Sequence, residues 1–338
     1  MARAVATWTW RPATPEGIEP ELTSLWSELA QHGAVARAVM SNLVVYRERT
    51  GAHAADADTL AGDPLIDGVM AQHPSRVIVL DHERGHAHAC GPLAAGVGVA
   101  MFGPDQARYG VEQIVVRSNC AEDSLPSIVR QLLRGDVPTS VWWTEDLSRV
   151  PPIAAIVDMG RQFLYDSRRW RDVRGGVSAL APLLSDGRGV DLADLNWRRL
   201  APVRQALVHA ADTAELRGLR DGDVHIVHQP GDAALAWLVV GWLRAQLQWS
   251  SRASPTIAEA TRGDAVLSIA VGAAPAELTV TLDSHRALVT HRGGPAPFAV
   301  TVPHEDDADA VAAELRNLSR SVCLHDAVAA LVRVFSQS

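Results

Sequence analysis

The sequence predicts an α/β protein made of two consecutive domains, each with a mixed sheet flanked by helices. Short β-branched and apolar runs alternate with amphipathic segments at helical spacing, which is typical of strands joined by helical crossovers. The order of elements in the second half resembles that in the first. The 338 residues, of which 47% are hydrophobic and 21% charged, are enough for two ordinary domains with sizeable cores.

In the first half, the apolar runs predict most of the sheet. Leu22, Leu25, Trp26 and Leu29 share one face of a predicted N-terminal helix over 20–31. The runs that follow predict strands at 43–46, 76–80, 97–102, 114–116 and 139–143, a strand-like segment at 163–167, and helices at 56–72 and 123–134.

Arginines and glycines follow Tyr165, and this change of composition predicts the domain boundary. We therefore expect an N-terminal domain over 1–168 and a C-terminal domain over 169–338, with no sheet crossing 166–190. In the second domain the helix over 232–249 is so apolar that it should be almost wholly buried. The other elements predicted there are helices at 197–214 and 322–335 and strands at 224–228, 265–271, 278–282, 287–291 and 298–302.

Charge and composition exclude several classes of function. A net charge of −8 and a pI near 5.9 argue against a general nucleic-acid binder, which needs a basic surface. No apolar stretch is long enough to span a membrane, so we expect a cytoplasmic protein. The chain contains no lysine, which excludes P-loop, kinase and Schiff-base mechanisms that depend on that residue. Three cysteines far apart in sequence predict reduced thiols.

The sequence offers weak candidates for metal or cofactor binding. An extended segment would place His86, His88 and Cys90 on one face, but no second ligand pair at zinc-like spacing accompanies them. Gly96 and Gly98 lack the third glycine and the following helix of a dinucleotide fingerprint. Cys120 stands before a helix whose first turn is acidic, which is typical of an ordinary thiol. We therefore expect no cofactor, no metal and no catalytic residue.

Two segments rich in tryptophan and arginine are the best candidates for a binding surface. Trp142 and Trp143 end a predicted strand, where an α/β sheet presents its working edge, although two rings packed beneath a loop explain them equally well. Asp194 or Asn196 can cap a helix on which Trp197 is flanked by arginines. That composition is typical of an interface or of an anion site, and a capped helix with solvated arginines is the alternative.

Five segments in a fixed order carry a resemblance to a known family. They are His73–Ile78, Pro138–Trp143, Phe163–Ser167, Asp194–Leu200 and Gly241–Trp249. In this order they resemble the OpcA family of glucose-6-phosphate dehydrogenase assembly proteins, from about Asn42 onward.

The resemblance implies a protein that is not itself an enzyme but assembles or activates glucose-6-phosphate dehydrogenase, the source of NADPH in the oxidative pentose phosphate pathway. The competing interpretation is a sugar-phosphate-binding protein or enzyme that uses arginines as a phosphate clamp. The redox control linked to some members is not carried over to these three cysteines. The residues expected at the partner surface are Trp142, Trp143, Asp194, Asn196, Trp197, Arg198 and Arg199.

Overall fold

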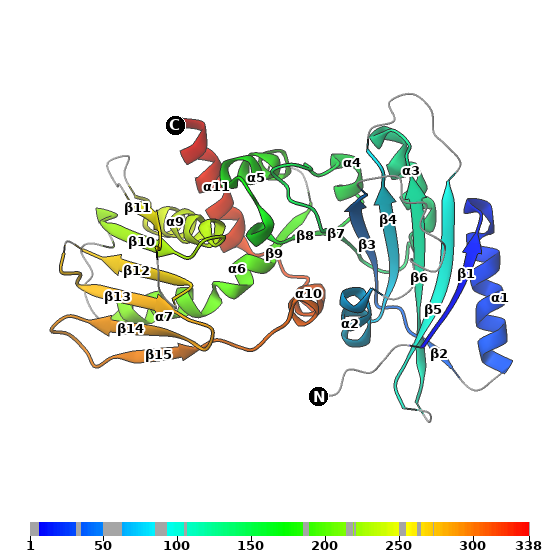
Figure 1. The fold of residues 1–338 in the computed structure, drawn as a ribbon, viewed down its shortest axis with the longest axis horizontal. Coiled ribbons are helices and arrows are strands. Elements are labelled where there is room, and N and C mark those ends of the chain that lie inside the picture. The colour runs from blue at the N-terminus through cyan, green and yellow to red at the C-terminus, as the bar shows by residue number, and fades with distance from the viewer. Residues whose placement is uncertain are drawn as a thin grey trace.

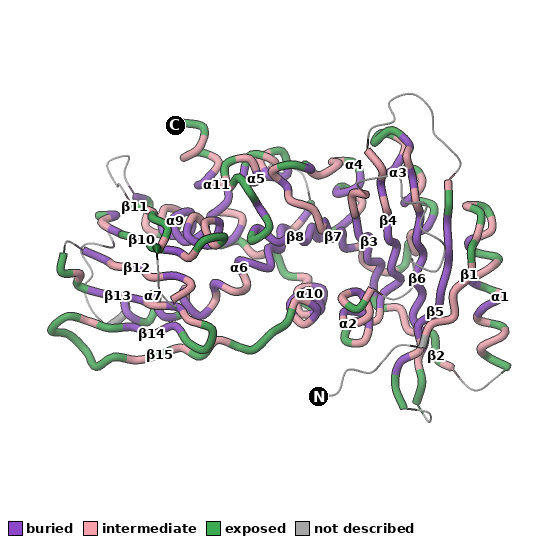
Figure 2. Tube along the Cα trace, in the orientation of Figure 1, coloured by how far each residue is buried: buried purple, intermediate pink, exposed green. Residues whose placement is uncertain are grey.

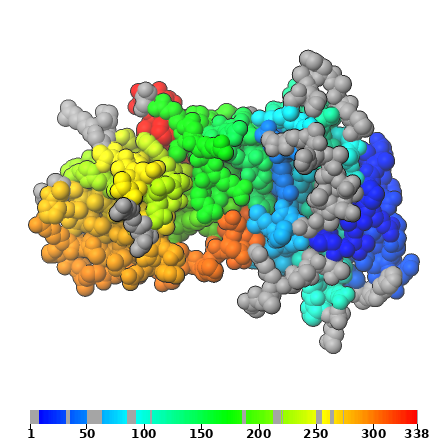
Figure 3. All heavy atoms as spheres, in the orientation of Figure 1, coloured from blue at the N-terminus to red at the C-terminus, as the bar shows by residue number. Residues whose placement is uncertain are grey.

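The computed structural model contains two sheets flanked by helices, joined end to end into an elongated molecule (Figure 1). No helix among the described residues is long and apolar enough to cross a membrane. Residues of the middle of the chain, green in Figure 3, lie between the N-terminal part in blue and the C-terminal part in yellow and orange, and they include β7, β8 and β9 of the first sheet. The structure describes residues 7–31, 35–49, 63–84, 93–104, 107–184, 189–213, 219, 221–249, 255–261, 265–272 and 274–337.

The first sheet has nine strands, ordered β1-β5-β6-β4-β3-β7-β8-β9, with the short β2 paired to β6. Strands β6, β4, β3, β7, β8 and β9 run parallel, while β5 and β1 are antiparallel to their neighbours. The strands are β1 (Thr7–Ala13), β2 (Ala36–Arg37), β3 (Ser41–Glu48), β4 (Ser75–His82), β5 (Ala94–Phe102), β6 (Tyr109–Ser118), β7 (Thr139–Trp143), β8 (Gln162–Tyr165) and β9 (Asp191–Asp194).

Helices cover both faces of this sheet, which explains why its strands are apolar in nearly every position. One face packs against α1 (Ile18–Gln31), α3 (Leu125–Leu132), α4 (Ala154–Val157) and α5 (Val173–Leu180). The other face packs against α2 (Pro64–Gln72) and α10 (Asp307–Arg316). Figure 2 shows the inner strands β3, β4, β6, β7 and β8 as buried along most of their length.

Strand β1 was not predicted, and it explains the two glycines of β5. A Cβ atom at Gly96 would lie 2.3 Å from Cζ2 of Trp10, and one at Gly98 would lie 2.5 Å from Cε3 of the same ring. The glycines therefore make room for the Trp10 indole, which lies across β5 from its place on the neighbouring strand. Their role in this fold is therefore in packing, which agrees with the lack of a complete dinucleotide fingerprint around them.

A buried ion-pair network fastens α1 to the sheet. Arg76 on β4 donates from Nη1 to Oε2 of Glu112 at 2.8 Å, and both side chains are almost fully buried. The second guanidinium nitrogen pairs with Glu19 of α1, while Nε donates to the carbonyl of Leu132 at 2.9 Å. Trp26 of α1 completes the network by donating to Oε1 of Glu112 at 2.7 Å.

The second sheet has six strands in the order β11-β10-β12-β13-β14-β15, antiparallel except for β10 with β11. Alternating burial along its strands shows that one face is packed and the other is open. Helices α7 (Ala201–Thr213), α9 (Ala233–Leu247) and α11 (Val322–Gln337) contribute to its core. The strands are β10 (Val224–His228), β11 (Thr256–Glu259), β12 (Leu267–Val271), β13 (Leu278–Leu282), β14 (Arg286–His291) and β15 (Phe298–Thr301).

The first sheet crosses the segment where a domain boundary was predicted. β9 pairs with β8 from Gln162↔Asp191 to Tyr165↔Asp194, so the expectation that no sheet crosses 166–190 is wrong. The sequence concealed β9 because a four-residue strand with aspartate at both ends has little strand character of its own. In addition, α10 of the C-terminal half packs on α2, and Gln162 donates from Nε2 to the carbonyls of Glu314 at 3.0 Å and Asn317 at 3.2 Å.

Candidate functional site at the junction of the two sheets

The paired tryptophans of β7 lie in the core, on opposite faces of the first sheet. Trp143 is 1% exposed, stacks on Tyr46 with ring centroids 3.8 Å apart, and donates from Nε1 to the carbonyl of Val150 at 2.9 Å. Trp142 is 4% exposed and packs on the side of α2 and α10. Because neighbouring residues of a strand point to opposite faces, the two rings cannot share one surface. The expectation that they emerge at a surface is therefore wrong.

The other predicted segment forms β9 and the short helix α6 (Leu195–Arg199). Asp194 caps this helix: its Oδ1 accepts the backbone N–H of Asn196 at 2.9 Å and that of Ser167 at 3.0 Å. Trp197 is buried, and the guanidinium carbon of Arg204 lies 3.9 Å from the centroid of a Trp197 ring. The capped helix predicted from the sequence is confirmed. The structure brings Asp194, Asn196, Trp197, Arg198 and Arg199 together here, while Trp142 and Trp143 lie two strands away on β7.

The two arginines of α6 form ion pairs with α10 and the segment before it, and with Asp166 after β8. Arg198 is bidentate on Glu305, with nitrogen–oxygen distances of 2.7 and 2.6 Å, and its Nη1 lies 3.4 Å from Glu314. Arg199 binds Asp166 at 2.8 and 3.2 Å and also reaches Asp307 at 3.1 Å. Fork-like pairs of this kind fix orientation as well as charge. Both arginines are therefore partly exposed but already paired, in contrast to the solvated arginines of the alternative interpretation.

Burial also perturbs the acid that caps α6. It raises the pKa of Asp194 to about 7, helped by the negative charge of Asp166 nearby. Tyr165, at the end of the neighbouring strand, is wholly buried, and burial raises the pKa of its phenol well above the usual value. Asp194 can therefore change its charge near neutral pH, although its position makes it a structural cap.

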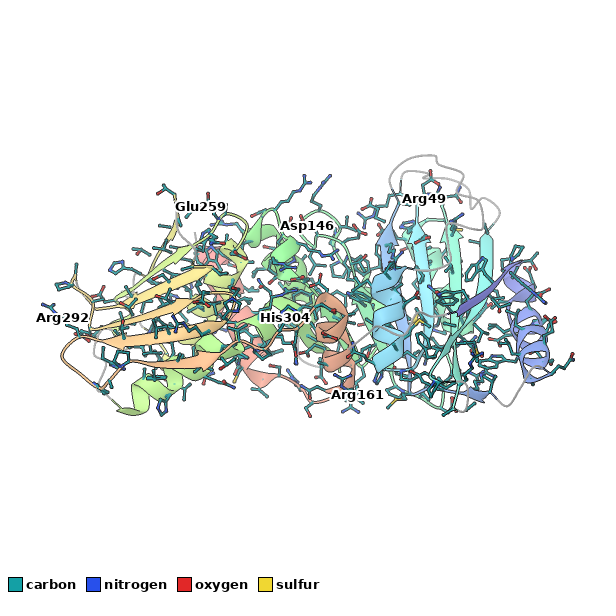
Figure 4. The ribbon with its side chains drawn as sticks, turned by 60° about the horizontal axis from the view of Figure 1, so that its bottom comes forward. Arg49, Asp146, Arg161, Glu259, Arg292 and His304 are labelled. Atoms are coloured by element: carbon teal, nitrogen blue, oxygen red, sulfur yellow. The ribbon has the colours of Figure 1, made fainter. Side chains whose placement is uncertain are left out.

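Beside α6 lies a pocket of about 530 Å³, here called the α6 pocket. Its walls come from the turn after β8, from α6, from the beginnings of α7 and α9, from the start of β12 and the end of β13, and from the segment after β15. Figure 4 shows His304, from that last segment, between the second sheet and α10. The lining residues are Arg168, Asn196, Arg198, Arg199, Ala201, Pro202, Gln205, Asp232, Leu235, Val266, Leu282, Asp283, Ser284, Thr301, Val302, Pro303, His304 and Glu305.

A smaller hollow of about 250 Å³ lies at the carboxyl ends of β3 and β7 and is lined partly by Glu48, Glu145 and Asp146. Asp146, labelled in Figure 4, accepts the backbone N–H groups of Ser148 and Arg171 at 2.9 and 3.0 Å. Glu145 accepts the backbone N–H of Glu48 at 2.9 Å. At least two of these carboxylates thus serve the local backbone, and the α6 pocket remains the stronger candidate site.

The remaining sequence candidates give no second site. His86, His88 and Cys90 lie outside the described residues. Within the part of the chain that the structure describes, no group of three potential metal ligands occurs. Cys120 is disulfide-bonded, so the expectation of three reduced thiols is wrong, because distance along a sequence does not set distance in a fold. Cys323 is an exposed free thiol.

Sequence reasoning missed four charged residues of the α6 pocket: Arg168, Asp232, Asp283 and Glu305. Arg168 was assigned to a connector and Asp232 to a helix start. A signal for Glu305 was present, since the acidic run 305–307 has the charge needed to pair with the adjacent arginines of 198–199. Sequence alone does not say which of several acidic runs faces those arginines.

Comparison with known proteins adds named relatives from cyanobacteria. Proteins named "Putative OxPP cycle protein OpcA" match this chain from Nostoc punctiforme at 29% identity, Synechocystis sp. at 24% and Synechococcus elongatus at 26%. The matches cover 60%, 56% and 56% of this chain. They cover 44%, 41% and 43% of the relatives, so the matched region spans less than half the length of these proteins.

Solved structures offer only distant likenesses. An oxidoreductase from Thermotoga maritima aligns with a TM-score of 0.42 and 11% identity over 87% of this chain and 95% of its own. A "putative myo-inositol dehydrogenase" from Sinorhizobium meliloti aligns with a TM-score of 0.39 and 11% identity over 88% and 98%. At such TM-scores neither protein bears on the activity of this chain.

Two family models match the chain in consecutive order. The first, described as the glucose-6-phosphate dehydrogenase subunit N-terminal domain, matches residues 67–182, and the second, the C-terminal domain of the same subunit, matches residues 190–328. Together they cover β4 to β9 of the first sheet, the whole second sheet and the α6 junction. The chain therefore belongs to the OpcA family of glucose-6-phosphate dehydrogenase assembly proteins.

Proposed function

We propose that this chain is a non-catalytic partner of glucose-6-phosphate dehydrogenase that binds the enzyme and favours its active oligomer, supporting NADPH production. The observation that carries the proposal is the consecutive match to both domains of the dehydrogenase subunit family. The lack of lysine, which removes several catalytic mechanisms, is consistent with a role in binding.

The energetic demand on such a partner is small. An activator must bind the active state of the enzyme more tightly than the inactive state. A tenfold shift between the two states needs only about 1.4 kcal/mol of differential binding. A few well-placed contacts supply this amount, and arginine is among the residues that most often dominate interfaces.

We place the contact surface beside α6, at the exposed atoms of Arg198 and Arg199. Their side chains are 31% and 26% exposed, so part of each side chain is accessible to a partner. The tryptophans of the predicted set would act indirectly, because they support the strands and the helix that carry these arginines. Asp194 and Asn196, both buried, would support α6 in the same way.

The test mixes the purified chain with the glucose-6-phosphate dehydrogenase of the same organism and measures complex formation and NADPH production. We expect a complex on a sizing column, an increased rate, and no activity of the chain alone. Replacing Arg198 with alanine should weaken the complex by about tenfold or more, a loss of roughly 1.4 kcal/mol or more.

Arg161→Ala is the matched control, because Arg161 is an exposed arginine at the opposite end of β8 from α6. Melting temperatures of both variants separate lost contacts from lost folding. Unchanged kinetics together with no complex would refute the proposed function. Normal binding by folded Arg198→Ala would refute only the surface.

A further inference from the structure

The α6 pocket contains a buried donor without a hydrogen-bond partner among the described residues, and a carboxylate that caps no backbone N–H. Asn196 is 1% exposed, lines the pocket, and has no hydrogen-bond partner for its Nδ2 among the described residues. Asp232, which also lines the pocket, caps no backbone N–H with its side chain at the start of α9, and its charged neighbours are Arg168, His228 and Arg199. A buried polar group without a partner costs stability, so such groups in native proteins call for an explanation.

The charges around the pocket leave one guanidinium available. Arg198 and Arg199 are each held by close bidentate contacts to a carboxylate. Arg168 differs, because its side chain is 46% exposed and its Nη2 stands 3.6 Å from Asp307, beyond hydrogen-bonding distance. The pocket therefore fits a ligand with a single anionic group better than one with several.

The start of α9 adds to this preference for an anion. This helix has 15 residues, and its N-cap Asp232 and first-turn Leu235 both line the pocket. The N-terminus of a helix carries partial positive charge and unpaired N–H groups, which favour phosphate and carboxylate groups. Arg168, the Asn196 amide and the beginning of α9 thus all offer N–H donors to the same pocket.

We propose that the α6 pocket binds a phosphorylated sugar. The phosphate would be held by Arg168, the Asn196 amide and the start of α9, and a sugar hydroxyl would donate to the carboxylate of Asp232. Leu235 and Val302 give the carbon skeleton an apolar wall. A volume of about 530 Å³ lies within the range of small-molecule sites. The inference goes beyond the proposed function and does not require the dehydrogenase.

The acceptor at Asp232 distinguishes a sugar phosphate from simpler anions. Burial raises the pKa of this carboxyl group, and the positive charges of Arg168, His228 and Arg199 oppose the rise. Inorganic phosphate satisfies Arg168 and Asn196 but brings further negative charge toward Asp232. A sugar phosphate carries hydroxyl donors besides its charge, and one of them can pair with the carboxylate of Asp232.

The test is isothermal titration of the full chain with three probes: glucose 6-phosphate, glucose and inorganic phosphate. We expect saturable binding of glucose 6-phosphate, and binding of glucose and of phosphate at least about tenfold weaker, because each lacks one set of contacts. Arg168→Ala and Asn196→Ala should each weaken glucose 6-phosphate binding by about tenfold or more. Arg161→Ala, an exposed arginine outside the pocket, should bind like the wild type.

Melting temperatures measured on the same samples show whether each variant is folded. Arg168 is half exposed, so its variant should fold even if the Asn196 variant does not. The proposal is overturned if glucose 6-phosphate does not bind, if inorganic phosphate binds as tightly, or if folded Arg168→Ala binds like the wild type. None of these results touches the proposed partnership, whose own test measures complex formation with the dehydrogenase.

Discussion

Replacing Trp143 distinguishes a core role for the paired tryptophans from a role at an interface. The ring is buried between Tyr46 and the helices on its face of the sheet, and its N–H is used by the carbonyl of Val150. Truncation of a buried tryptophan to alanine costs about 3–5 kcal/mol. We expect Trp143→Ala near the upper end of this range, because the substitution also removes an aromatic stack worth about 0.5–1.5 kcal/mol.

Trp143→Phe separates these contributions. It keeps most of the apolar ring and leaves the Val150 carbonyl without its donor, so we expect a loss of about 1–3 kcal/mol. Val208→Ala, at a half-exposed position on α7, is the control and should change stability by less than about 0.5 kcal/mol.

The assay is urea unfolding, with the free energy of unfolding obtained by linear extrapolation. Stabilities of whole proteins are about 5–15 kcal/mol, so Trp143→Ala should remove a large share. A loss below about 1 kcal/mol, the typical effect of an ordinary substitution, would show that the ring is not packed as described. If Trp143→Ala kept its stability in this way but no longer bound the dehydrogenase, the ring would belong to the interface.

Two further predictions concern buried charges. Arg76→Met should destabilise the protein by about 3 kcal/mol, the lower end of the cost of breaking a buried ion pair, because Arg37 still pairs with the stranded Glu112. In urea unfolding, adding Glu112→Leu should recover part of the loss, and a double variant less stable than the single one would contradict this reasoning. Burial raises the pKa of Asp194 from 3.8 to about 7, so the folded state retains a proton that the unfolded state releases, and stability should fall as pH rises between these values. Asp194→Asn should flatten that decline in unfolding measured from about pH 4 to 7, and an unchanged pH profile would show that Asp194 is not the group responsible.

The sequence predicts this fold best where a segment carries its own periodicity. The central strands β3, β4 and β7 and the apolar helix α9 are confirmed close to their expected bounds, because burial on both sides leaves only apolar residues at most positions. Strand β1 was missed because its two exposed-looking tryptophans make sense only beside the glycines of β5. Such a pairing joins residues about ninety apart, which no local pattern reveals.

The candidate site was predictable in part. The cap at Asp194 and the cluster of α6 followed from residue types and spacing, and both are present. The pocket beside α6 was not predictable, because its walls come from six separate parts of the chain and its charge balance depends on which carboxylate each arginine meets. The surface position of Trp142 and Trp143 was wrongly predicted, because burial also depends on distant parts of the chain: α2 and α10 cover the ring of Trp142.

The packing of α10 on α2 has a consequence for biosynthesis. The helix that covers the second face of the first sheet comes from residues 307–316, near the end of the chain, and Gln162 at the sheet binds the carbonyls of Glu314 and Asn317. During synthesis at about 5–20 residues per second, the ribosome must add well over a hundred residues after β9 before this helix emerges. For several seconds or more, nascent chains therefore expose an apolar face of a nearly complete sheet, the stage at which chaperones would be most needed.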